Sequence, residues 1–464
     1  MGVDFDVVVV GFGPTGATLA ALLGQAGVRT LVVDRAREVY DRPRAFALDH
    51  EIMRVFQNLG IARAVLPHTA PFTPSEYYGV DGQLIKRLGS IDPPYPLGWP
   101  PNLVFNQPAI EKILRERVAS FPSVEVKLGV SLESFSLPEV KISGERILAS
   151  CLVGCDGAAS TVRQQLGIEY EDLEFDEPWL VVDLVVGDSG LAKLPQVSVQ
   201  YCEPSRPCTY LIGPGAHRRW EIMLLPGEDP ARMEKEVWTL LSRWLSPEDA
   251  RLWRVASYRF HALVAREWRR GNVFLAGDAA HQQPPFTGQG MCQGIRDAAN
   301  LAWKLTRQNE SLLRSYEVER KTHVRRLTST IKEIGRLICE RDPAAARARD
   351  MRLLAEAGGD VRTVPRQSLI PPLEAGFLSP IPHPANGTLF PQPRMADGRL
   401  LDDVAGTGFR VFRKEFFNNT QGAAWFERNG AIAALVRPDH YVYGVARDEA
   451  DLERQKALME KALQ

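Results

Sequence analysis

Cysteine, net charge and long apolar runs are all scarce in this sequence, and each shortage excludes a class of protein. The six cysteines are scattered without a CxxC pair, which predicts no zinc site and favours a reducing, cytoplasmic setting. The net charge of -1 supplies no basic field for nucleic acid or an anionic membrane. No window approaches the roughly 18 to 20 apolar residues that span a bilayer. No basic segment precedes the first strand, so we expect a protein that is neither membrane-inserted nor exported.

The rest of the composition is that of an ordinary globular protein. Hydrophobic residues make up 45% and charged residues 24% of the chain, a balance typical of proteins that fold in water. A length of 464 residues exceeds a single ordinary hydrophobic core, so we expect two or three domains.

The first chemical signal is a glycine-rich turn between a strand and a helix near the start of the chain. Residues 5–10 form a β-branched run suited to a buried parallel strand. A small-residue helix follows the turn, and a second strand, residues 28–33, ends at Asp34. The turn itself reads Gly11-Phe12-Gly13-Pro14-Thr15-Gly16.

Each part of this turn suits a dinucleotide. Gly11 permits the tight turn, Gly13 lets the backbone approach a pyrophosphate, and Gly16 allows close packing of helix and strand. The helix amino terminus offers free N–H groups to phosphates, and Asp34 is placed to accept hydrogen bonds from a ribose. The alternative is a glycine-rich turn without a ligand, and the motif alone does not separate FAD from NAD.

Two distant segments share a second pattern, in which an apolar strand ends at a glycine and an acid. The first, residues 151–163, contains Asp156-Gly157 and ends at Arg163. The second, residues 272–291, contains Gly277-Asp278 and continues through a proline- and glycine-rich stretch into a helix. Each aspartate taken singly could shape a turn or cap a segment. Together with the first turn they favour a ligand site.

These three signatures, in this order and at these separations, resemble the group A flavoprotein monooxygenases, the para-hydroxybenzoate hydroxylase superfamily. Residues 277–305 look closest to its 3-(3-hydroxyphenyl)propionate hydroxylase and phenol hydroxylase-like branch, and the resemblance covers roughly residues 4–340. It implies an α/β FAD-binding Rossmann-like domain of the glutathione-reductase type with an inserted, mostly β substrate domain. The implied activity is FAD-dependent hydroxylation of a phenolic substrate.

The resemblance also implies which residues hold FAD. Asp278 would bond the ribityl chain, Arg35 would lie against the adenine, and Gln107 would reach ribityl or phosphate oxygens. Asp156 would lie near the pyrophosphate, with Arg163 supporting its turn. The full implied set is Gly11, Gly13, Pro14, Thr15, Gly16, Asp34, Arg35, Arg44, Gln107, Asp156, Gly157, Arg163, Gly277, Asp278, Pro285, Gly288, Gln289, Gly290 and Met291.

The chemistry of the implied family needs NADH or NADPH and O₂ as transient co-substrates and no metal. A C4a-hydroperoxide of the flavin would transfer oxygen to an electron-rich phenolate ring. A helix that begins near Gly290 would stabilise the reduced flavin anion with its N–H groups. His281 is a candidate for the proton transfer, weighed against a packing role. Candidate substrate-pocket residues are Tyr201, Tyr210, Trp220 and Pro284.

The chain divides into four predicted parts. Residues 1–177 and 266–340 form the FAD-binding domain, residues 178–265 a β-sheet substrate domain, and residues 365–395 a proline-rich connector. Residues 396–464 resemble a small thioredoxin-like α+β module, whose lack of cysteine excludes redox activity there. A packing role or support of a homodimer is left open for it. A long helix over residues 311–337 is predicted to carry its charges on a solvated face.

Other functions on the same fold are weighed beside the hydroxylase. A halogenase of this type usually carries a WxWxIP stretch, which residues 220–226 do not match. A reductase, or a flavin-binding protein without oxygenase turnover, is the further alternative. No second GxGxxG module is present, which fits a nicotinamide that docks briefly and leaves NADH against NADPH open.

Overall fold

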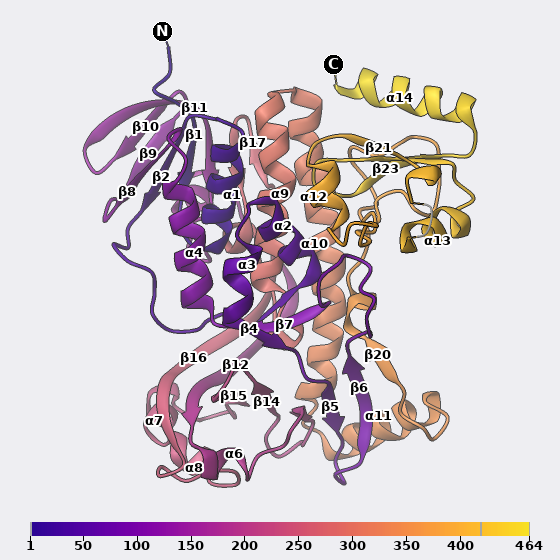
Figure 1. Ribbon diagram of the computed structural model, residues 1–464. Coiled ribbons are helices and arrows are strands. Elements are labelled where there is room, and N and C mark those ends of the chain that lie inside the picture. The colour runs from indigo at the N-terminus through magenta and orange to yellow at the C-terminus, as the bar shows by residue number, and fades with distance from the viewer. Residues whose placement is uncertain (1, 418–419, 464) are drawn as a thin grey trace.

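A computed structural model describes residues 2–417 and 420–463 of the chain. Figure 1 shows three regions: a sheet flanked by helices that contains the amino terminus, a second large sheet below it, and a small module at the carboxyl end. Helix α10 (Glu310–Cys339) runs along all three. Within the described residues, no helix is long and apolar enough to cross a membrane.

The first sheet has the strand order β17-β18-β11-β1-β2-β8. Strands β18, β11, β1, β2 and β8 are parallel, and β17 pairs antiparallel with β18. Val8 and Val9 of β1 are fully buried, as are Leu31 and Val32 of β2, because helices cover both faces of such a sheet. The strands are β1 (Phe5–Val10), β2 (Thr30–Asp34), β8 (Val124–Leu128), β11 (Glu145–Gly154), β17 (Arg269–Arg270) and β18 (Val273–Leu275). Strand β10 (Glu139–Ile142) pairs with β11, and β9 (Leu132–Ser136) pairs with β10. Helices α1 (Pro14–Gln25), α4 (Gln107–Ala119), α5 (Thr161–Gln165) and α9 (Gly290–Arg307) belong to this region.

The second sheet has nine strands in the order β19-β16-β12-β15-β14-β13-β5-β6-β20. Five of them lie within the predicted insert or extend into it: β12 (Tyr170–Val186), β13 (Ser198–Tyr201), β14 (Cys208–Ile212), β15 (His217–Met223) and β16 (Ala250–Ala265). The others are β5 (Ser75–Tyr78), β6 (Leu84–Gly89), β19 (His281–Gln282) and β20 (Thr363–Pro365), all from outside residues 178–265. The sheet is therefore larger than the predicted insert, because β5 pairs with β13 across more than a hundred residues.

Shorter elements complete these two regions. A small antiparallel sheet has the order β3-β7-β4. Its strands and the neighbouring helices are β3 (Ala47–Asp49), α2 (His50–Asn58), α3 (Ala62–Val65), β4 (Thr69–Pro71) and β7 (Asn102–Phe105). Helices α6 (Asp188–Leu191), α7 (Pro230–Lys235) and α8 (Val237–Leu241) lie against the second sheet, and α11 (Pro343–Glu356) follows α10.

Helix α10 differs from its predicted role as a helix with a solvated charged face. Glu319 and Arg320 are buried, and that part of the prediction is wrong. The Glu319 carboxylate lies 2.9 Å from Lys304 Nζ of α9 and 2.7 Å from Arg437 Nη2. The Arg320 guanidinium donates to Asp297 of α9 at 2.8 Å. These two charges thus join α10 to α9 of the first region and to the carboxyl-terminal module, and sequence spacing alone does not show that.

The carboxyl-terminal module is α+β, with a three-stranded antiparallel sheet in the order β21-β22-β23. Its elements are α12 (Leu401–Ala405), β21 (Arg410–Arg413), α13 (Gln421–Arg428), β22 (Ala433–Val436), β23 (Val442–Ala446) and α14 (Glu449–Leu463). The buried Arg54 of α2 holds Asp402 of this module through two hydrogen bonds of 2.5 and 3.0 Å. Its thioredoxin-like classification stays a prediction.

Candidate active site

A single cavity of about 940 Å³ lies between the first sheet and the second. It begins at the glycine turn after β1 and passes the amino end of α9. It ends against one face of β12, β13, β14 and β15. The three motif segments, which are far apart in the sequence, all contribute to its wall, so the fold brings the predicted signatures together.

The dinucleotide end of the cavity is formed by the glycine turn and by α1. Gly11 and Gly13 line it together with Pro14 and Thr15. Gly11 has a φ of 105°, which favours glycine, and a Cβ there would lie 2.3 Å from the carbonyl oxygen of Cys155. A Cβ on Gly13 would meet no atom within 4 Å, so that side of the backbone is open to a ligand.

Asp34 closes this end from the tip of β2. Its carboxylate accepts hydrogen bonds from the N–H groups of Phe12 (2.6 Å) and Ala36 (2.7 Å). Arg35 lines the cavity beside it. Arg115, which the sequence did not single out, donates to the Phe12 carbonyl at 2.9 Å and lies 4.6 Å from the Phe12 ring centroid. The acid at the end of β2 therefore holds the glycine turn in shape and faces the cavity.

Two loops with aspartates form the middle of the cavity. Asp156 accepts from the N–H of Val162 at 3.1 Å through one oxygen, and the other oxygen is buried without a partner among the described residues. Asp278 lines the cavity, and its side chain is open to the space inside it. Desolvation by the surrounding protein raises the pKa of both carboxyl groups. A ligand that donates hydrogen bonds would satisfy them.

Arg44 and Gln107 meet at the side of the cavity. The Gln107 side-chain oxygen accepts from the backbone N–H groups of Arg44 (3.0 Å) and Ala45 (2.6 Å). Its nitrogen donates to Glu111 at 3.3 Å. Gln107 therefore fixes the loop that carries Arg44, while both residues line the cavity.

The amino end of α9 points at the cavity. Gly288, with a φ of 63°, turns the chain into the helix, and Gly288, Gly290 and Met291 line the wall together with Pro285. A helix amino terminus carries unpaired N–H groups and a partial positive charge. This end of the cavity therefore suits a ligand that carries or acquires negative charge.

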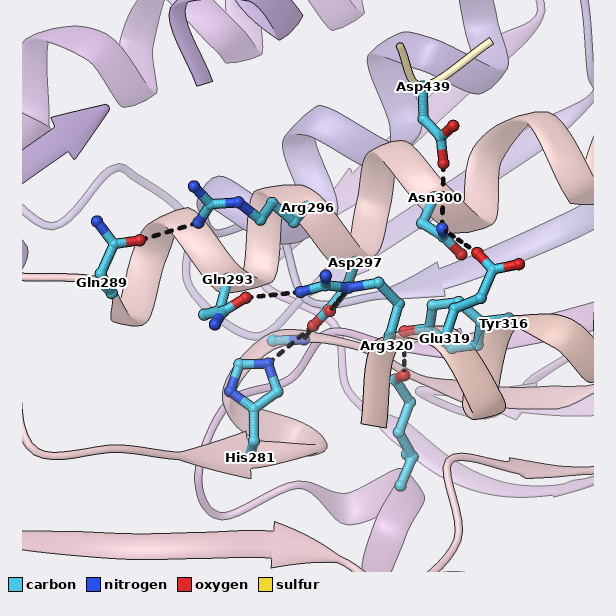
Figure 2. A network of polar contacts seen from close by, with 12 residues as sticks. His281, Gln289, Gln293, Arg296, Asp297, Asn300, Tyr316, Glu319, Arg320 and Asp439 are labelled. Carbon is cyan, nitrogen blue, oxygen red and sulfur yellow. Dashed lines mark hydrogen bonds and ion pairs between the residues drawn. The ribbon is translucent and has the colours of Figure 1, made fainter. Parts of the chain in front are cut away.

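His281 lines this wall of the cavity and belongs to a buried network of polar contacts (Figure 2). Its Nε2 lies 2.8 Å from Asp297, which also accepts from the N–H of Gly277 at 2.9 Å and from Arg320. The ring stacks on Trp268 at 5.3 Å between centroids, and Nδ1 is buried without a partner in the described chain. These contacts orient the Gly277–Asp278 turn. A proton-transfer role for His281 stays a prediction.

Four predicted cofactor residues do not line the cavity. Gly16 packs against the Gly11 carbonyl, and Gly277 packs against Thr15. Arg163 donates to the Ile168 carbonyl at 2.9 Å and lies over the Tyr170 ring. Gln289 accepts from Arg296 at 2.9 Å. All four support the loops that form the wall.

The prediction for the substrate pocket is wrong about which face of the second sheet meets the cavity. Tyr201, Tyr210 and Trp220 belong to the hydrophobic cluster on the opposite face, under α7 and α8. Pro284 is also buried and lies outside the lining. Successive side chains of a strand point to opposite faces, so the adjacent residues face the cavity instead. Those residues are Gln200, Thr209, Leu211, Arg219 and Glu221.

The substrate end combines aromatic walls with a few polar groups. Phe46, Phe72, Phe260 and Phe286 supply apolar surface. Thr209 donates to the Gln200 side-chain oxygen at 2.5 Å. Sites of this kind, apolar with a few placed polar groups, are typical for small aromatic ligands.

Arg366 enters this end from the predicted proline-rich connector. It donates to the Thr287 carbonyl, and its guanidinium carbon lies 4.1 Å from the Phe72 ring centroid. Burial lowers its pKa, and it forms no ion pair with any residue in 2–417 or 420–463. A buried cation without a carboxylate partner favours an anionic or strongly hydrogen-bonding ligand.

The residues present fit FAD. Besides the free Asp156 oxygen, the Gln283 amide lines the cavity, and its nitrogen and oxygen are withdrawn from solvent without a partner in the described chain. The open backbone at Gly13, the cavity-facing Asp278 and the helix amino end at Gly290 complete a cradle for phosphates, ribityl hydroxyls and a polar ring edge.

Comparison with known proteins agrees with this cradle. Residues 4–330 match the family described as FAD binding domain. A probable NADH-specific resorcinol 4-hydroxylase of Rhodococcus jostii (strain RHA1) is 36% identical, with 96% of this chain and 93% of that protein covered. A 3-(3-hydroxy-phenyl)propionate/3-hydroxycinnamic acid hydroxylase of Mycobacterium sp. (strain JLS) is 35% identical, with 97% and 83% covered.

A solved structure shows the same fold over the whole chain. The flavin-dependent monooxygenase PieE, crystallised with FAD and substrate, superposes with a TM-score of 0.82 at 21% sequence identity, and the match covers 100% of both chains. At that identity the likeness concerns the fold alone.

Proposed function

This chain belongs to the group A FAD-dependent aromatic monooxygenases, and we propose that it hydroxylates a single-ring phenol with a polar group meta to the hydroxyl. FAD is its cofactor and a nicotinamide its reductant. The observation that carries the substrate proposal is the continuous cavity, which joins the dinucleotide turn to an aromatic chamber with a few polar groups.

The proposed reaction balances with O₂ as oxidant. One phenol, one NADH, one proton and one O₂ give the hydroxylated phenol, NAD⁺ and water. Bound FAD accepts the hydride and activates oxygen as an electrophile. The chain binds and orients the ring, excludes water and manages the phenol proton.

The named relatives support the substrate class. Resorcinol bears a second hydroxyl meta to the first, and 3-(3-hydroxyphenyl)propionate bears its side chain at the same position. The aromatic walls of the chamber suit one ring, and Gln200, Thr209, Glu221 and Arg366 supply polar contacts around it. The NADH-specific relative supports NADH as the reductant.

We assign the FAD contacts to the residues that line the cradle. Gly11, Gly13 and the start of α1 would hold the pyrophosphate, and Asp34 the ribose. Asp278 would hold the ribityl chain, and the amino end of α9 would face the isoalloxazine. The first-turn N–H groups and open glycine backbone support this assignment.

Reconstitution with FAD tests the proposal. The holoprotein is mixed anaerobically with NADH, with or without resorcinol or 3-(3-hydroxyphenyl)propionate, and flavin bleaching is followed. Aerobic product is then identified by mass. Faster reduction with one phenol and a product heavier by one oxygen atom are expected. Reduction that is indifferent to both phenols, without product, would contradict the proposal.

A further inference from the structure

The carboxyl group of Glu221 is buried in the cavity wall without a hydrogen-bond partner among the described residues. Glu221 lies on β15 and its exposed fraction is 4%. Its carboxylate accepts no hydrogen bond from residues 2–417 or 420–463, and its nearest cation is Arg219, with Nη1 4.0 Å from Oε1. Buried carboxylates normally have partners. A ligand in the cavity is the group left to supply one.

The guanidinium of Arg219 donates its hydrogen bonds to groups other than Glu221. It donates to both oxygens of Asp183, at 2.7 and 3.0 Å. It also donates to the carbonyl oxygens of Arg44 at 2.9 Å and Pro43 at 3.2 Å. Its charge is therefore shared with Asp183, and its hydrogen-bonding groups point to the loop beside the cofactor cradle rather than to Glu221.

The position of Glu221 is that of a substrate contact. In the sheet register Glu221 lies between Val181 of β12 and Thr209 of β14. All three line the cavity. Val181 packs in the same cluster as Phe286, which lies just ahead of α9. A ring between the sheet and the segment that leads into α9 would therefore have Glu221 beside it.

We propose that Glu221 is the base that takes the proton of the substrate's phenol hydroxyl, an inference that rests on the proposed function. As a ring carbon bonds the outer atom of the activated oxygen, the O–O bond breaks, and the inner oxygen keeps that electron pair and ends as water. In the same step the O–H proton moves to the Glu221 carboxylate and the O–H electron pair enters the ring. Loss of the ring C–H proton to water and return of the Glu221 proton to the phenol oxygen restore the aromatic ring.

The electrostatic surroundings suit an acceptor that also returns its proton. Burial raises the pKa of Glu221 to about 7, against the lowering effect of Arg219, and Asp183 raises it further. Arg254 of β16 lies 3.8 Å from Asp183 and faces that carboxylate. Arg366 enters the same cavity from the connector. A base that titrates near the working pH is the most effective one.

The test compares FAD-loaded wild type with Glu221→Gln and Glu221→Asp. Glu177→Gln is the control, because Glu177 lies on β12, on the same face as Val181, outside the cavity. Product formation from resorcinol is measured from pH 6 to 9, and resorcinol affinity is read from the flavin difference spectrum. Infrared spectra of wild type minus Glu221→Gln report the protonated carboxyl band directly.

We expect the wild-type rate to rise through pH 7 together with loss of the carboxyl band. In Glu221→Gln the rate should no longer rise through pH 7 (the pH limb of the wild type). This variant should form product about 100-fold more slowly at pH 8, and its affinity for resorcinol should change far less. Glu221→Asp should keep the limb at a lower rate, and Glu177→Gln should match wild type.

Two results would overturn the inference in distinguishable ways. Wild-type hydroxylation together with an unchanged pH limb in Glu221→Gln removes Glu221 from the reaction and leaves the proposed function standing. FAD-loaded wild type that makes no product from either phenol refutes both.

Discussion

At the scale of single residues, the cavity holds two buried charges of opposite sign, neither with a full partner. Glu221 and Arg366 are each less than 10% exposed, and burial works against the charge of both. Such groups reduce stability unless a ligand completes them. Their presence at the substrate end is therefore better explained by binding and chemistry than by folding.

Replacing Glu221 with Gln should stabilise the FAD-free protein at pH 8. The folded-state pKa of about 7 lies above the unfolded value, so the destabilisation by Glu221 is absent below the unfolded pKa, grows as the pH rises from there to 7, and is complete above pH 7. The free energy of unfolding should rise by up to about 3 kcal/mol at pH 8 and change little at pH 4. Urea unfolding at both pH values measures this. Equal effects at the two pH values would contradict it.

Replacing Arg366 with Gln should raise the KM for 3-(3-hydroxyphenyl)propionate more than the KM for resorcinol. A carboxylate side chain would pair with the buried guanidinium, whereas a second hydroxyl needs only a hydrogen bond. We expect the KM for 3-(3-hydroxyphenyl)propionate to rise about tenfold or more relative to that for resorcinol. The control is Arg362→Gln, which changes an exposed arginine four residues earlier. Proportional rises for both phenols would rule out a carboxylate contact.

At the scale of elements, the turn between β1 and α1 separates a binding glycine from a packing glycine. Gly13 has ordinary backbone angles, with φ of -75°, and open space at its Cβ position. A Cβ on Gly16 would lie 1.9 Å from the Gly11 carbonyl oxygen. The same substitution should therefore act on FAD at one position and on folding at the other.

Gly13→Ala should weaken FAD binding about tenfold or more, since the methyl group occupies the space of the pyrophosphate. The FAD-free protein should keep its stability or gain up to about 1 kcal/mol. Gly16→Ala should lose roughly 1–3 kcal/mol through overpacking. Fluorescence titration with FAD and urea unfolding give the two quantities. A destabilised Gly13→Ala with normal FAD affinity would reverse the assignment.

The elements also show what could be predicted from sequence. The glycine turn was predictable because its requirements are local: a strand, positive φ at Gly11 and an acid at the end of β2. Which face of the second sheet lines the cavity could not be predicted. Tyr201 and Gln200 are neighbours on one strand, and alternation fixes two faces without saying which one is covered by α7 and α8.

The burial of residues whose partners are distant in the sequence could not be predicted, for a related reason. Arg366 lies in a segment expected to be a connector, and Glu319 and Arg320 lie on a helix whose spacing suits a solvated face. Their burial depends on partners such as Thr287, Arg437 and Asp297, which are distant in the sequence. Only the folded arrangement brings these groups together.

At the scale of the whole molecule, the carboxyl-terminal module is attached to the FAD-binding region by buried charges. Arg54 holds Asp402, and Tyr441 donates to Glu51 at 2.7 Å. Burial opposes ionisation of Asp402, but Arg54 and its neighbours keep the pKa of that carboxyl well below its usual value. The stabilisation is thus complete at neutral pH and is lost only as the pH falls below the unfolded pKa of about 3.9.

Arg54→Met should therefore destabilise the protein at pH 7 by about 3 kcal/mol or more, because it leaves Asp402 buried with fewer partners. Arg413→Met is the control, since Arg413 pairs with Glu449 on the exposed surface of the same module and should matter little. Thermal unfolding of both variants measures the difference. Equal melting temperatures would show that the module is held mainly by apolar contacts.

A chain of contacts leads from that module to the cofactor cradle. Tyr441 bonds Glu51, Glu51 accepts from Arg296 at 2.5 Å, and Arg296 donates to Gln289 at the start of α9. Among the described residues, none from 396 to 463 lines the cavity. Thermodynamic linkage is reciprocal, so loading the enzyme with FAD should slow amide hydrogen exchange in β22 and β23. The module would then report cofactor occupancy from a distance, as a sensor rather than a binding surface.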